Sequence, residues 1–473
     1  MNVEVRNLGV IREAKIDVKP LTVLVGPNNA GKTWLAYTFA GVLGQYGQRN
    51  YSQALVNGEV HDEYPPLTDA IQQVLSEGNA KIDLVRFVEE WGERYVNNVA
   101  KRAKSWMRQF MRTGLVSFDN LEIYIRLEEL QEEAKAKILH YALNRSIGVG
   151  QGKREALLNL LKEAGKPDLY LYTSTEVDIS VKLPPPAIES LVMVNVMNIL
   201  ARVFFADKRI FPTERTTYIT SPFSNRELNR QSRITNERPL NEQGMGVLSV
   251  PVSLFVSMIE SAFSMTLLEK EEREKAAQNN EQIRRYIQLA QILEQQILQG
   301  NIDFSTPEPG PTSIQRDILF QPTHGITLEI PLASSMVKEL SSLVLYLRYL
   351  AEPGDWLVID EPEMNLHPEA QVQITELLAM LVHAGLRVLI TTHSPYIVDH
   401  LANLMKAAEN EDQEAISDQF YLKSTAAFIP AKQVSAYLID KGEARNILEP
   451  EGIIDWRTFS KVSDRVMQIY FEL

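Results

Sequence analysis

The octapeptide Gly-Pro-Asn-Asn-Ala-Gly-Lys-Thr at residues 26–33 directly follows an apolar run at residues 21–25. It fits G-x-x-x-x-G-K-[ST], a loop between a strand and a helix whose backbone N–H groups point into one concavity. The helix-forming residues that follow place this concavity at a helix N-terminus, which suits anionic phosphate groups. The pattern therefore predicts a strand–loop–helix unit that holds nucleotide phosphates.

The residues of this loop have separate expected roles. The Lys32 ammonium reaches the β- and γ-phosphates, and the Thr33 hydroxyl takes one Mg²⁺ position. The remaining loop positions line the concavity. The expected nucleotide-binding residues in the loop are Gly26, Asn28, Asn29, Ala30, Gly31, Lys32 and Thr33.

Length and composition set the broad class. A chain of 473 residues is expected to form two or three structural units, and 45% hydrophobic with 23% charged residues is typical of a globular protein. With no cysteine, disulfides and thiolate metal sites are excluded, which agrees with a reducing cytoplasm. The charged start does not resemble a signal peptide, and the apolar stretch at residues 191–206 is interrupted by Asn195, Asn198 and Arg202. We expect a cytoplasmic protein without a membrane partner.

The formal net charge is −13, so bulk electrostatics does not draw the whole molecule to nucleic acid. Two locally basic segments, residues 101–112 and 208–238, are candidates for a local DNA contact. A solvated face is the favoured interpretation of each segment, and DNA stays a possible partner.

The order of expected elements indicates an interrupted α/β core. Residues 3–6, 14–18 and 21–25 are expected to be strands, and residues 67–113 and 128–144 to be helical. Residues 121–127 and 168–183 alternate as strands do, and the prolines at 184–186 predict a stop and a unit boundary. Near the end of the chain, a helix is expected at 338–350 and strands at 356–360 and 386–391. Alternating helices and strands predict a parallel sheet, to which strand 21–25 before the phosphate loop also belongs.

Residues 252–299 contain neither proline nor glycine, and they predict either a projecting helical arm or two ordinary surface helices. As one helix it would be about 70 Å long, whereas a turn near Asn279 and Asn280 would fold it into a hairpin. We therefore expect five segments: an N-terminal head part, a mixed helical and strand insertion, a return to the head, a helical arm and a C-terminal head part. Their expected limits are 1–66, 67–185, 186–246, 247–300 and 301–473.

An apolar strand ending in Asp360 and Glu361 is the partner that a phosphate loop needs. Asp360 is expected to hold Mg²⁺ through its water shell, and Glu361 to polarise the water that attacks the γ-phosphate. His393, at the end of the next strand, lies where ligands bind in parallel sheets. It is expected to donate a hydrogen bond to the γ-phosphate or to the attacking water.

These motifs resemble those of ABC-class ATPases, in the branch that includes the SMC and RecF proteins and the OLD-type ATPases. The style is closest to the AAA-family ATPase subunits of bacterial antiphage defence systems of the PtuA and AriA kind. The matching parts are the Walker A loop at 26–33, the Walker B run ending Asp360-Glu361-Pro362-Glu363, the switch Thr392-His393-Ser394, a D-loop at Asn365-Leu366-His367-Pro368, a signature region with Ser334 and Ser335, and a Pro-x-Glu-Arg island containing Glu214 and Arg215.

The resemblance implies an α/β ABC-type ATPase head with a mixed or parallel sheet, a helical insertion and a short helical or coiled-coil arm. It also implies a Mg²⁺-dependent ATPase in which two heads sandwich ATP, the signature serines Ser334 and Ser335 of one subunit completing the site of the other. Met336 stands where the signature has glycine, and no Q-loop glutamine is evident.

Three functions fit this resemblance. The first is a sensor or scaffold subunit of a bacterial antiphage complex that controls a separately encoded effector, a nuclease or a toxin. An effector has to be separate because no Asp-x-Asp pattern of a Toprim nuclease follows His393 and no HNH cluster is present. The second is a RecF- or SMC-like DNA repair or recombination ATPase. The third is a slow-turnover, nucleotide-gated scaffold.

Overall fold

The computed structural model describes residues 1–149, 155–173, 184–205, 208–220, 248–265, 267–305, 317–449, 452–455 and 468–470. The chain forms two compact units. Unit 1 consists of Met1–Val5, Gly41–Trp106 and Leu121–Ala206, and unit 2 of Arg6–Ala40, Met107–Asn120 and Asp207–Leu473. The five-segment division expected from the sequence stays a prediction, and the two units are described here separately.

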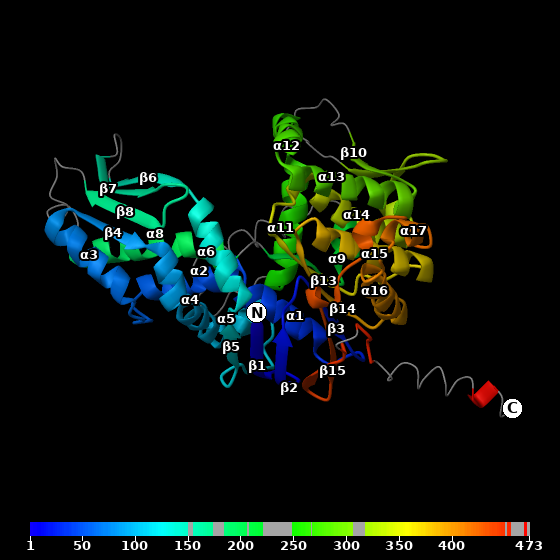
Figure 1. The fold of residues 1–473 in the computed structure, drawn as a ribbon, viewed down its shortest axis with the longest axis horizontal. Helices are drawn as coiled ribbons and strands as arrows, with labels where there is room; N and C mark the ends of the chain where they lie inside the picture. The colour runs from blue at the N-terminus through cyan, green and yellow to red at the C-terminus, as the bar shows by residue number, and fades with distance from the viewer. Residues whose placement is uncertain are drawn as a thin grey trace. The chain divides into compact units, whose positions relative to one another are not determined.

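Unit 1 is built of helices and a four-stranded antiparallel sheet of order β4-β8-β7-β6 (Figure 1). Strand β1 and helix α5 each run from one unit into the other. The elements are β1 (Asn2–Leu8), α2 (Gln45–Val56), α3 (Pro65–Glu77), β4 (Asn79–Asp83), α4 (Leu84–Lys101), α5 (Ala103–Phe110), β5 (Glu122–Arg126), α6 (Glu129–His140), β6 (Leu143–Val149), β7 (Glu155–Lys162), β8 (Asp168–Thr173) and α8 (Pro185–Phe204).

One sequence expectation for unit 1 was wrong. The helical stretch expected over residues 67–113 is interrupted by β4, whose alternating burial lets it pair with β8. At the prolines 184–186, where the sequence predicts a stop and a unit boundary, helix α8 begins, because a missing N–H costs nothing in the first turn of a helix. The part of the expected strand 168–183 beyond Thr173 lies outside the described residues.

Helix α8 is the one helix of the described ranges that is long and apolar enough to cross a membrane by itself. More than half of its apolar window (56%) is buried inside the protein, as in the core helix of a globular domain. A second candidate, α11 with α12, counts only if a pair bent by 95° is taken as one span. Both observations rest on length and composition alone and are weak indications of a membrane span.

Unit 2 is a mixed α/β unit. Its elements are β2 (Ile11–Asp17), β3 (Leu21–Val25), α1 (Lys32–Val42, which ends in unit 1), β9 (Lys208–Phe211), α9 (Arg215–Thr220), α11 (Val250–Ser264), α12 (Leu267–Asn279), α13 (Glu281–Ile292), a π-helix (Leu293–Leu298), β10 (Gly300–Phe304), β11 (Ile318–Pro322), β12 (Leu328–Glu329), a 3-10 turn (Ile330–Leu332), α14 (Ser335–Leu345), a second π-helix (Tyr346–Leu350), β13 (Trp356–Asp360), α15 (Pro368–His383), β14 (Arg387–Thr392), α16 (Pro395–Ala408), α17 (Gln413–Ser417), 3-10 turns (Thr425–Ala427 and Ala431–Gln433), β15 (Val434–Asp440) and β16 (Glu443–Asn446).

The large sheet of unit 2 runs in the order β2-β16-β15-β3-β14-β13-β9. The five strands from β15 to β9 are parallel, and β16 pairs with β15 antiparallel. Strands β3 and β13 are buried along their whole length, as expected for parallel strands that are covered on both faces. The mixed α/β fold expected from the sequence is therefore confirmed.

Strand register brings the predicted motifs to one edge of this sheet. Val25 pairs with Thr392, and Thr391 pairs with Asp360. The carboxyl ends of β3, β14, β13 and β9 consequently lie side by side, although β3 is far from the others in the chain. This edge is where parallel α/β sheets bind their ligands.

Helices cover the sheet and build one continuous apolar core. Figure 1 shows α14, α15 and α16 gathered beside β13, β14 and β3, and α15 packs against both β14 and α16. Buried side chains of α13, α14 and α15 join the apolar side chains of these strands in a single cluster. The core thus fixes the strands whose ends carry the motifs.

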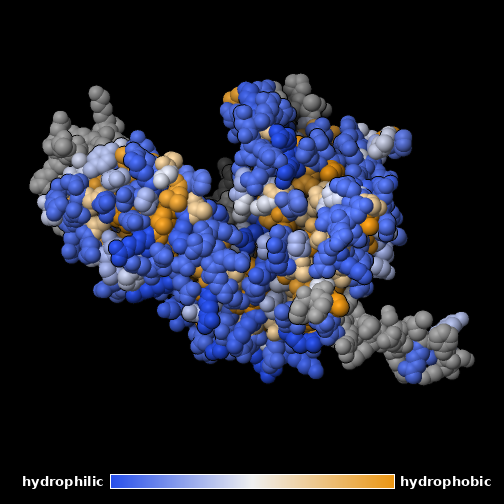
Figure 2. Space-filling view, viewed as in Figure 1, coloured by the Kyte–Doolittle hydropathy of each residue, from blue (hydrophilic) through white to orange (hydrophobic). Residues whose placement is uncertain are grey.

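The expected arm is a broken helix rather than one rod of about 70 Å. The chain bends between α11 and α12. A second break lies at Asn280, the N-cap of α13, and α13 packs against α12 as the hairpin alternative predicts. Helix α13 buries Ile283, Tyr286 and Leu289 in the core of unit 2. Helix α12 carries the charged run, and its surface in Figure 2 is mostly hydrophilic.

Candidate functional site

The loop at residues 26–33 connects β3 to α1 and needs glycine at both of its Gly positions. Gly26 has φ +154°, and a Cβ there would lie 2.2 Å from the carbonyl oxygen of Ile439 on β15. Gly31 has φ +100°, and a Cβ there would lie 2.6 Å from Cδ1 of Ile11. The loop therefore curls into a space that only backbone can fill, as the sequence motif predicts.

Lys32 lies inside the curl of this loop. Its side chain is buried, and Nζ donates to the carbonyl oxygens of Gly26 at 2.9 Å and Pro27 at 3.0 Å. Burial lowers the pKa of the Lys32 ammonium, against the opposing effect of the nearby carboxylates of β13 and the turn after it. An ammonium held by neutral carbonyls in a partly desolvated cradle gains a stronger partner when a phosphate anion enters.

The tip of the loop is open to solvent. Asn28 and Asn29 are exposed, Ala30 is half-buried, and Asn29 has a positive φ of 63°. The N–H of Ala30 donates to Pro27 O at 3.4 Å, which closes the turn. These three residues are thus placed to surround a phosphate chain rather than to pack in the core.

Asp360 stands opposite Thr33 at the end of β13. Thr33 Oγ1 donates to Asp360 Oδ1 at 3.0 Å, Thr391 Oγ1 donates to the same oxygen, and Tyr37 OH donates to Oδ2 at 3.3 Å. Asp360 is fully buried, and burial raises the pKa of its carboxyl above 3.8, against hydrogen bonds from Thr391 and Thr33 that lower it.

The Thr33 and Asp360 oxygens fit Mg²⁺. A hydroxyl and a carboxylate within hydrogen-bond distance of each other are hard oxygen donors of the kind that Mg²⁺ uses together with phosphate oxygens and water. Among the described residues there is no cluster of three His, Cys, Asp or Glu side chains able to hold a metal on its own. The donor set therefore suits an ion that arrives with a phosphate ligand.

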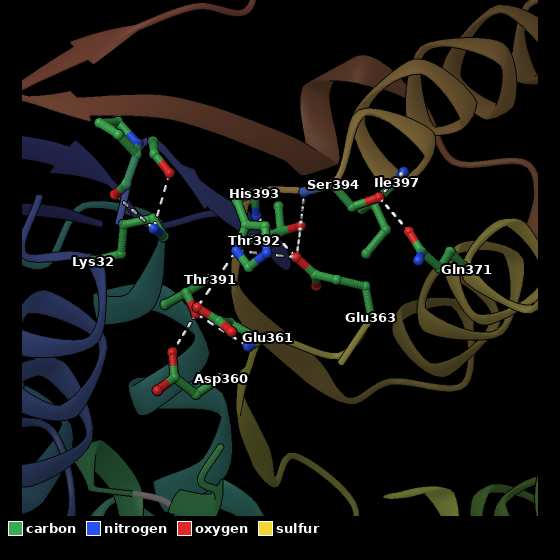
Figure 3. A network of polar contacts seen from close by, with 12 residues as sticks. Lys32, Asp360, Glu361, Glu363, Gln371, Thr391, Thr392, His393, Ser394 and Ile397 are labelled. Atoms are coloured by element: carbon green, nitrogen blue, oxygen red, sulfur yellow. Dashed lines mark hydrogen bonds and ion pairs between the residues drawn. The ribbon is translucent and has the colours of Figure 1, made fainter. Parts of the chain in front are cut away.

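Glu361 and His393 face each other across the same edge (Figure 3). His393 Nδ1 lies 3.4 Å from Glu361 Oε1, and both side chains are partly exposed. The backbone of Glu361 is left-handed, with φ +50°, and its N–H donates to both the carbonyl and the hydroxyl oxygen of Thr391. The carboxylate thus leaves the buried strand and faces His393 at this edge of the sheet.

Glu363 organises the switch loop and was not predicted to have a role. Its Oε1 accepts from Thr392 Oγ1 at 2.6 Å and from the N–H of His393 at 2.9 Å, and it lies 3.8 Å from His393 Nδ1. Its Oε2 and His393 Nδ1 are buried atoms without a hydrogen-bond partner. Because a buried polar atom without a hydrogen-bond partner is costly, a ligand or water that bonds to these two atoms would stabilise the site.

Gln371 of α15 joins the switch to the D-loop, and this link too was missed. Ser394 Oγ donates to Gln371 Oε1 at 2.5 Å, while Gln371 Nε2 donates to Leu366 O at 2.9 Å. Ser394 also caps α16 by accepting from the N–H of Ile397. No local sequence pattern identifies Gln371, because it is an ordinary polar side chain near the start of α15.

Arg215 of the Pro-x-Glu-Arg island is buried beneath Asp360 and Glu361. Its guanidinium donates to the main-chain oxygens of both residues, at 2.8 and 2.9 Å. Its Nε lies 2.7 Å from Oε2 of Glu339, a buried residue of α14. The locally basic segment 208–238 therefore does not present Arg215 to solvent, and residues 221–238 of that segment lie outside the described residues.

Ser334 and Ser335 are exposed at the start of α14. Ser334 is the N-cap of α14, and its Oγ accepts from the N–H of Val337 at 3.4 Å. Within the described ranges no hydrogen bond connects either serine with the phosphate loop, Asp360 or Glu361 of the same chain. The structure thus unites Lys32, Thr33, Asp360, Glu361 and His393 at one edge, and leaves the two signature serines outside it.

Comparisons with known proteins agree with this geometry in part. Residues 210–399 match the family model described as "AAA domain, putative AbiEii toxin, Type IV TA system". This range contains Asp360, Glu361 and His393 but not the loop at 26–33. No curated protein sequence matches the chain.

Solved structures that resemble the chain include three SMC head domains. The Smc head bound to the C-winged helix domain of ScpA is 12% identical with a TM-score of 0.36, covering 94% of this chain and 96% of that chain. The Smc head with an extended coiled coil bound to the C-terminal domain of ScpA from Pyrococcus furiosus is 10% identical with a TM-score of 0.36, covering 99% and 98%. The SMC head from Thermotoga maritima is 12% identical with a TM-score of 0.29, covering 94% and 97%.

Two observations bear on function, the family match and the geometry of the site. The match covers the strand that carries Asp360 and the switch that carries His393. The phosphate loop, which lies outside the match, has the backbone that its motif demands. Together they support a P-loop ATPase with a mixed α/β head.

Proposed function

We propose that this chain is an ABC-class, Mg²⁺-dependent ATPase that dimerises around ATP in the cytoplasm. In this proposal it is the sensor or scaffold subunit of a bacterial antiphage defence complex, and it controls a separately encoded effector. The observation that carries the ATPase part is the meeting of Lys32, Thr33, Asp360, Glu361 and His393 at the carboxyl edge of one parallel sheet.

Each of these side chains has a task that its surroundings support. Lys32 exchanges the carbonyl oxygens of Gly26 and Pro27 for phosphate oxygens, and Thr33 and Asp360 hold the metal. Mg²⁺, when bound, neutralises charge on the phosphates. Glu361 orients a water molecule and accepts its proton, and His393 donates a hydrogen bond beside it.

The two-subunit part of the proposal rests on the exposed start of α14. Ser334 and Ser335 lie there in solvent, next to Leu332, whose side chain is 69% exposed. Hydroxyl donors beside an exposed apolar residue suit the partner's nucleotide and the partner's surface. The description of the matched family names a toxin of a type IV toxin–antitoxin system. Such a system has two components, which agrees with a protein that works together with a second one.

The ATPase part is tested with Lys32→Ala and Glu361→Gln, and Lys15→Ala serves as a control because Lys15 is an exposed lysine paired with Glu13. We expect Lys32→Ala to abolish binding of a fluorescent ATP analogue. We expect Glu361→Gln to bind it normally while kcat falls roughly 10²–10⁴-fold. Normal nucleotide affinity in Lys32→Ala would refute the site.

The defence part is tested by purifying the protein from its native source and identifying what travels with it. A nuclease or toxin that leaves the complex in an ATP-dependent way supports the proposal. Stimulation of ATP hydrolysis by DNA ends, with no protein effector bound, would instead indicate a repair ATPase. A wild-type protein that barely hydrolyses ATP but holds partners in the ATP-bound form would indicate a slow scaffold.

A further inference from the structure

We propose that Arg215 and Glu339 form a buried connection through which α14 sets the position of the catalytic carboxylate Glu361 in the same chain. Arg215 is thereby a positioning residue, and a second copy that docks on the start of α14 acts on Glu361 through it. This inference rests on the proposed ATPase function, because it assigns to the island a role in that reaction.

Arg215 holds the end of β13 through its main chain. NH1 donates to the carbonyl oxygens of Pro212, at 3.0 Å, and Asp360, at 2.8 Å, and NH2 donates to that of Glu361 at 2.9 Å. Arginine has a rigid fork of donors, so these bonds fix two consecutive carbonyl groups together. A lysine at this position cannot reproduce that geometry.

The main chain of Glu361 needs such support. Its φ of +50° is a conformation that non-glycine residues adopt rarely. The turn that follows is closed by the N–H of Met364, which donates to Glu361 O at 3.1 Å, so Arg215 and Met364 share that carbonyl oxygen. The direction of the Glu361 side chain therefore depends on bonds that Arg215 supplies.

Glu339 is the junction at the other end of the connection. Its Oε2 pairs with Nε of Arg215, and its Oε1 accepts from Thr216 Oγ1 at 2.5 Å and from Asn365 Nδ2 at 2.8 Å. Asn365 belongs to the predicted D-loop and also has a positive φ, 59°. One carboxylate of α14 thus holds the island and the loop after Glu361 at once.

Glu339 lies on the first turns of the helix that begins with the signature serines. Ser335 and Glu339 are four residues apart, so they share one face of α14, about one turn from each other. A helix moves as a rigid element over this distance. A displacement at Ser334 and Ser335 must consequently displace Glu339, and with it Arg215.

Stability alone does not explain a buried ion pair at this place. Replacing such a pair by apolar residues is often neutral or stabilising, because taking two charges out of water is costly. The chain has a second pair of the same kind, Arg348 with Glu294, in which Arg348 donates to Ile302 O and Glu294 accepts from the N–H of Ile302. Within the described residues, its hydrogen bonds run to Ile302 and not to β13 or the loop after it, so it is the matched control.

The experiment compares Arg215→Lys and Glu339→Gln with Arg348→Lys and Glu294→Gln. The first readout from the full chain is kinetic: kcat and KM for ATP, together with the affinity for a fluorescent ATP analogue. The second readout is backbone hydrogen exchange of residues 356–366, measured without nucleotide. We expect Arg215→Lys and Glu339→Gln to lower kcat at least ~10-fold, with KM and nucleotide affinity changed less than about twofold. Exchange at Glu361 and Met364 should accelerate at least ~10-fold. The control variants should leave both readouts unchanged at similar melting temperatures.

Other outcomes decide against the connection. Normal kcat and normal exchange in Glu339→Gln would show that the pair is only structural, and so would equal losses in Glu294→Gln. If Arg215→Lys does not fold, Glu339→Gln, which keeps its size and its acceptor oxygen, decides alone. A wild type that binds no ATP refutes the proposed function, whereas the hydrogen-exchange readout still tests whether Arg215 holds Glu361.

Discussion

Asp360 illustrates at the scale of one residue how a functional group reduces stability. The carboxylate is fully buried, and burial raises its pKa above the ordinary value of 3.8. The unfolded chain therefore loses this proton at a lower pH than the folded chain does. By linkage, the contribution of Asp360 to the stability of the nucleotide-free protein falls as pH rises from 3.8 through the raised pKa.

Asp360→Asn should stabilise the nucleotide-free protein while destroying Mg²⁺-dependent hydrolysis. The amide removes a buried charge and still accepts from Thr33 and Thr391, so we expect a gain of about 1 kcal/mol in the free energy of unfolding at neutral pH. The measurement is urea unfolding in EDTA at neutral pH and again near pH 4, where the gain should shrink.

The control is Asp355→Asn, because Asp355 directly precedes β13 and Asp360 is the last residue of that strand. Asp355 is buried but pairs with Arg209 at 3.4 Å and accepts from Tyr346 OH, so the substitution breaks an ion pair and should destabilise the protein. A loss of stability in Asp360→Asn comparable to that in Asp355→Asn would show that the Asp360 charge is well compensated.

Sequence alone could predict the residues that stand in local motifs. Lys32, Thr33, Asp360, Glu361 and His393 each follow a buried strand, and parallel strands end at one edge, so their meeting follows from the pattern. The partners that hold them do not follow from any pattern. Glu363, Gln371 and Glu339 are ordinary side chains of turns and helices, and their role depends on which strand lies next to which.

At the scale of elements, the stability of α13 depends on its N-cap residue, Asn280. Asn280 Oδ1 accepts from the N–H groups of Gln282, at 2.9 Å, and Ile283, at 3.3 Å, and so caps the helix that packs Tyr286 into the core. We expect Asn280→Ala to lower the free energy of unfolding by about 1 kcal/mol and to leave kcat unchanged. Thermal or urea unfolding measures the first effect and a steady-state ATPase assay the second.

Asn279→Ala is the matched control, because Asn279 is exposed in the last turn of α12 and only bonds back to Lys275 O. It should be neutral or slightly stabilising, since alanine favours a helix. Equal losses in the two variants would mean that the α12–α13 connection, rather than the cap, is what the substitution weakens.

The elements themselves were predictable where apolar periodicity is strong. Strands β1, β2, β3, β5, β13 and β14 and helix α6 lie close to where the pattern indicates them. Strand β4 was missed because five residues of alternating burial are too few to compete with helix-forming neighbours, and pairing with β8 decides its conformation. The start of α8 at the prolines 184–186 was not predicted, although proline suits the first turn of a helix.

At the scale of the whole molecule, the proposed dimer depends on Ser334 both as a cap and as a donor to the partner's nucleotide. Ser334→Asp separates these roles. Aspartate is a good N-cap, so α14 should keep its stability, but a carboxylate faces the phosphates in place of a hydroxyl. We expect the double variant Ser334→Asp/Glu361→Gln to have a melting temperature equal to or above that of Glu361→Gln. We also expect it to stay monomeric with ATP and Mg²⁺, which light scattering measures.

Glu361→Gln alone should be dimeric under the same conditions, and Lys32→Ala should be monomeric with or without ATP. Ser334→Ala loses the cap and the donor together and therefore serves for comparison. An ATP-dependent dimer of the Ser334→Asp protein would show that the start of α14 is not in the interface.

The place of β3 in the sheet also determines when this protein can first fold. Strand β3 leaves the ribosome long before either of its neighbours, because β3 ends at Val25 whereas β14 begins at Arg387 and β15 at Val434. At roughly 5–20 residues per second of synthesis, its two backbone edges wait on the order of tens of seconds for partners. During that time the nascent chain exposes a strand that is apolar except for Thr22. We therefore expect it to depend on a chaperone more than a chain whose paired strands are neighbours in the sequence. A chain that ends before β13 lacks Asp360 and Glu361, the two carboxylates of the proposed ATPase site.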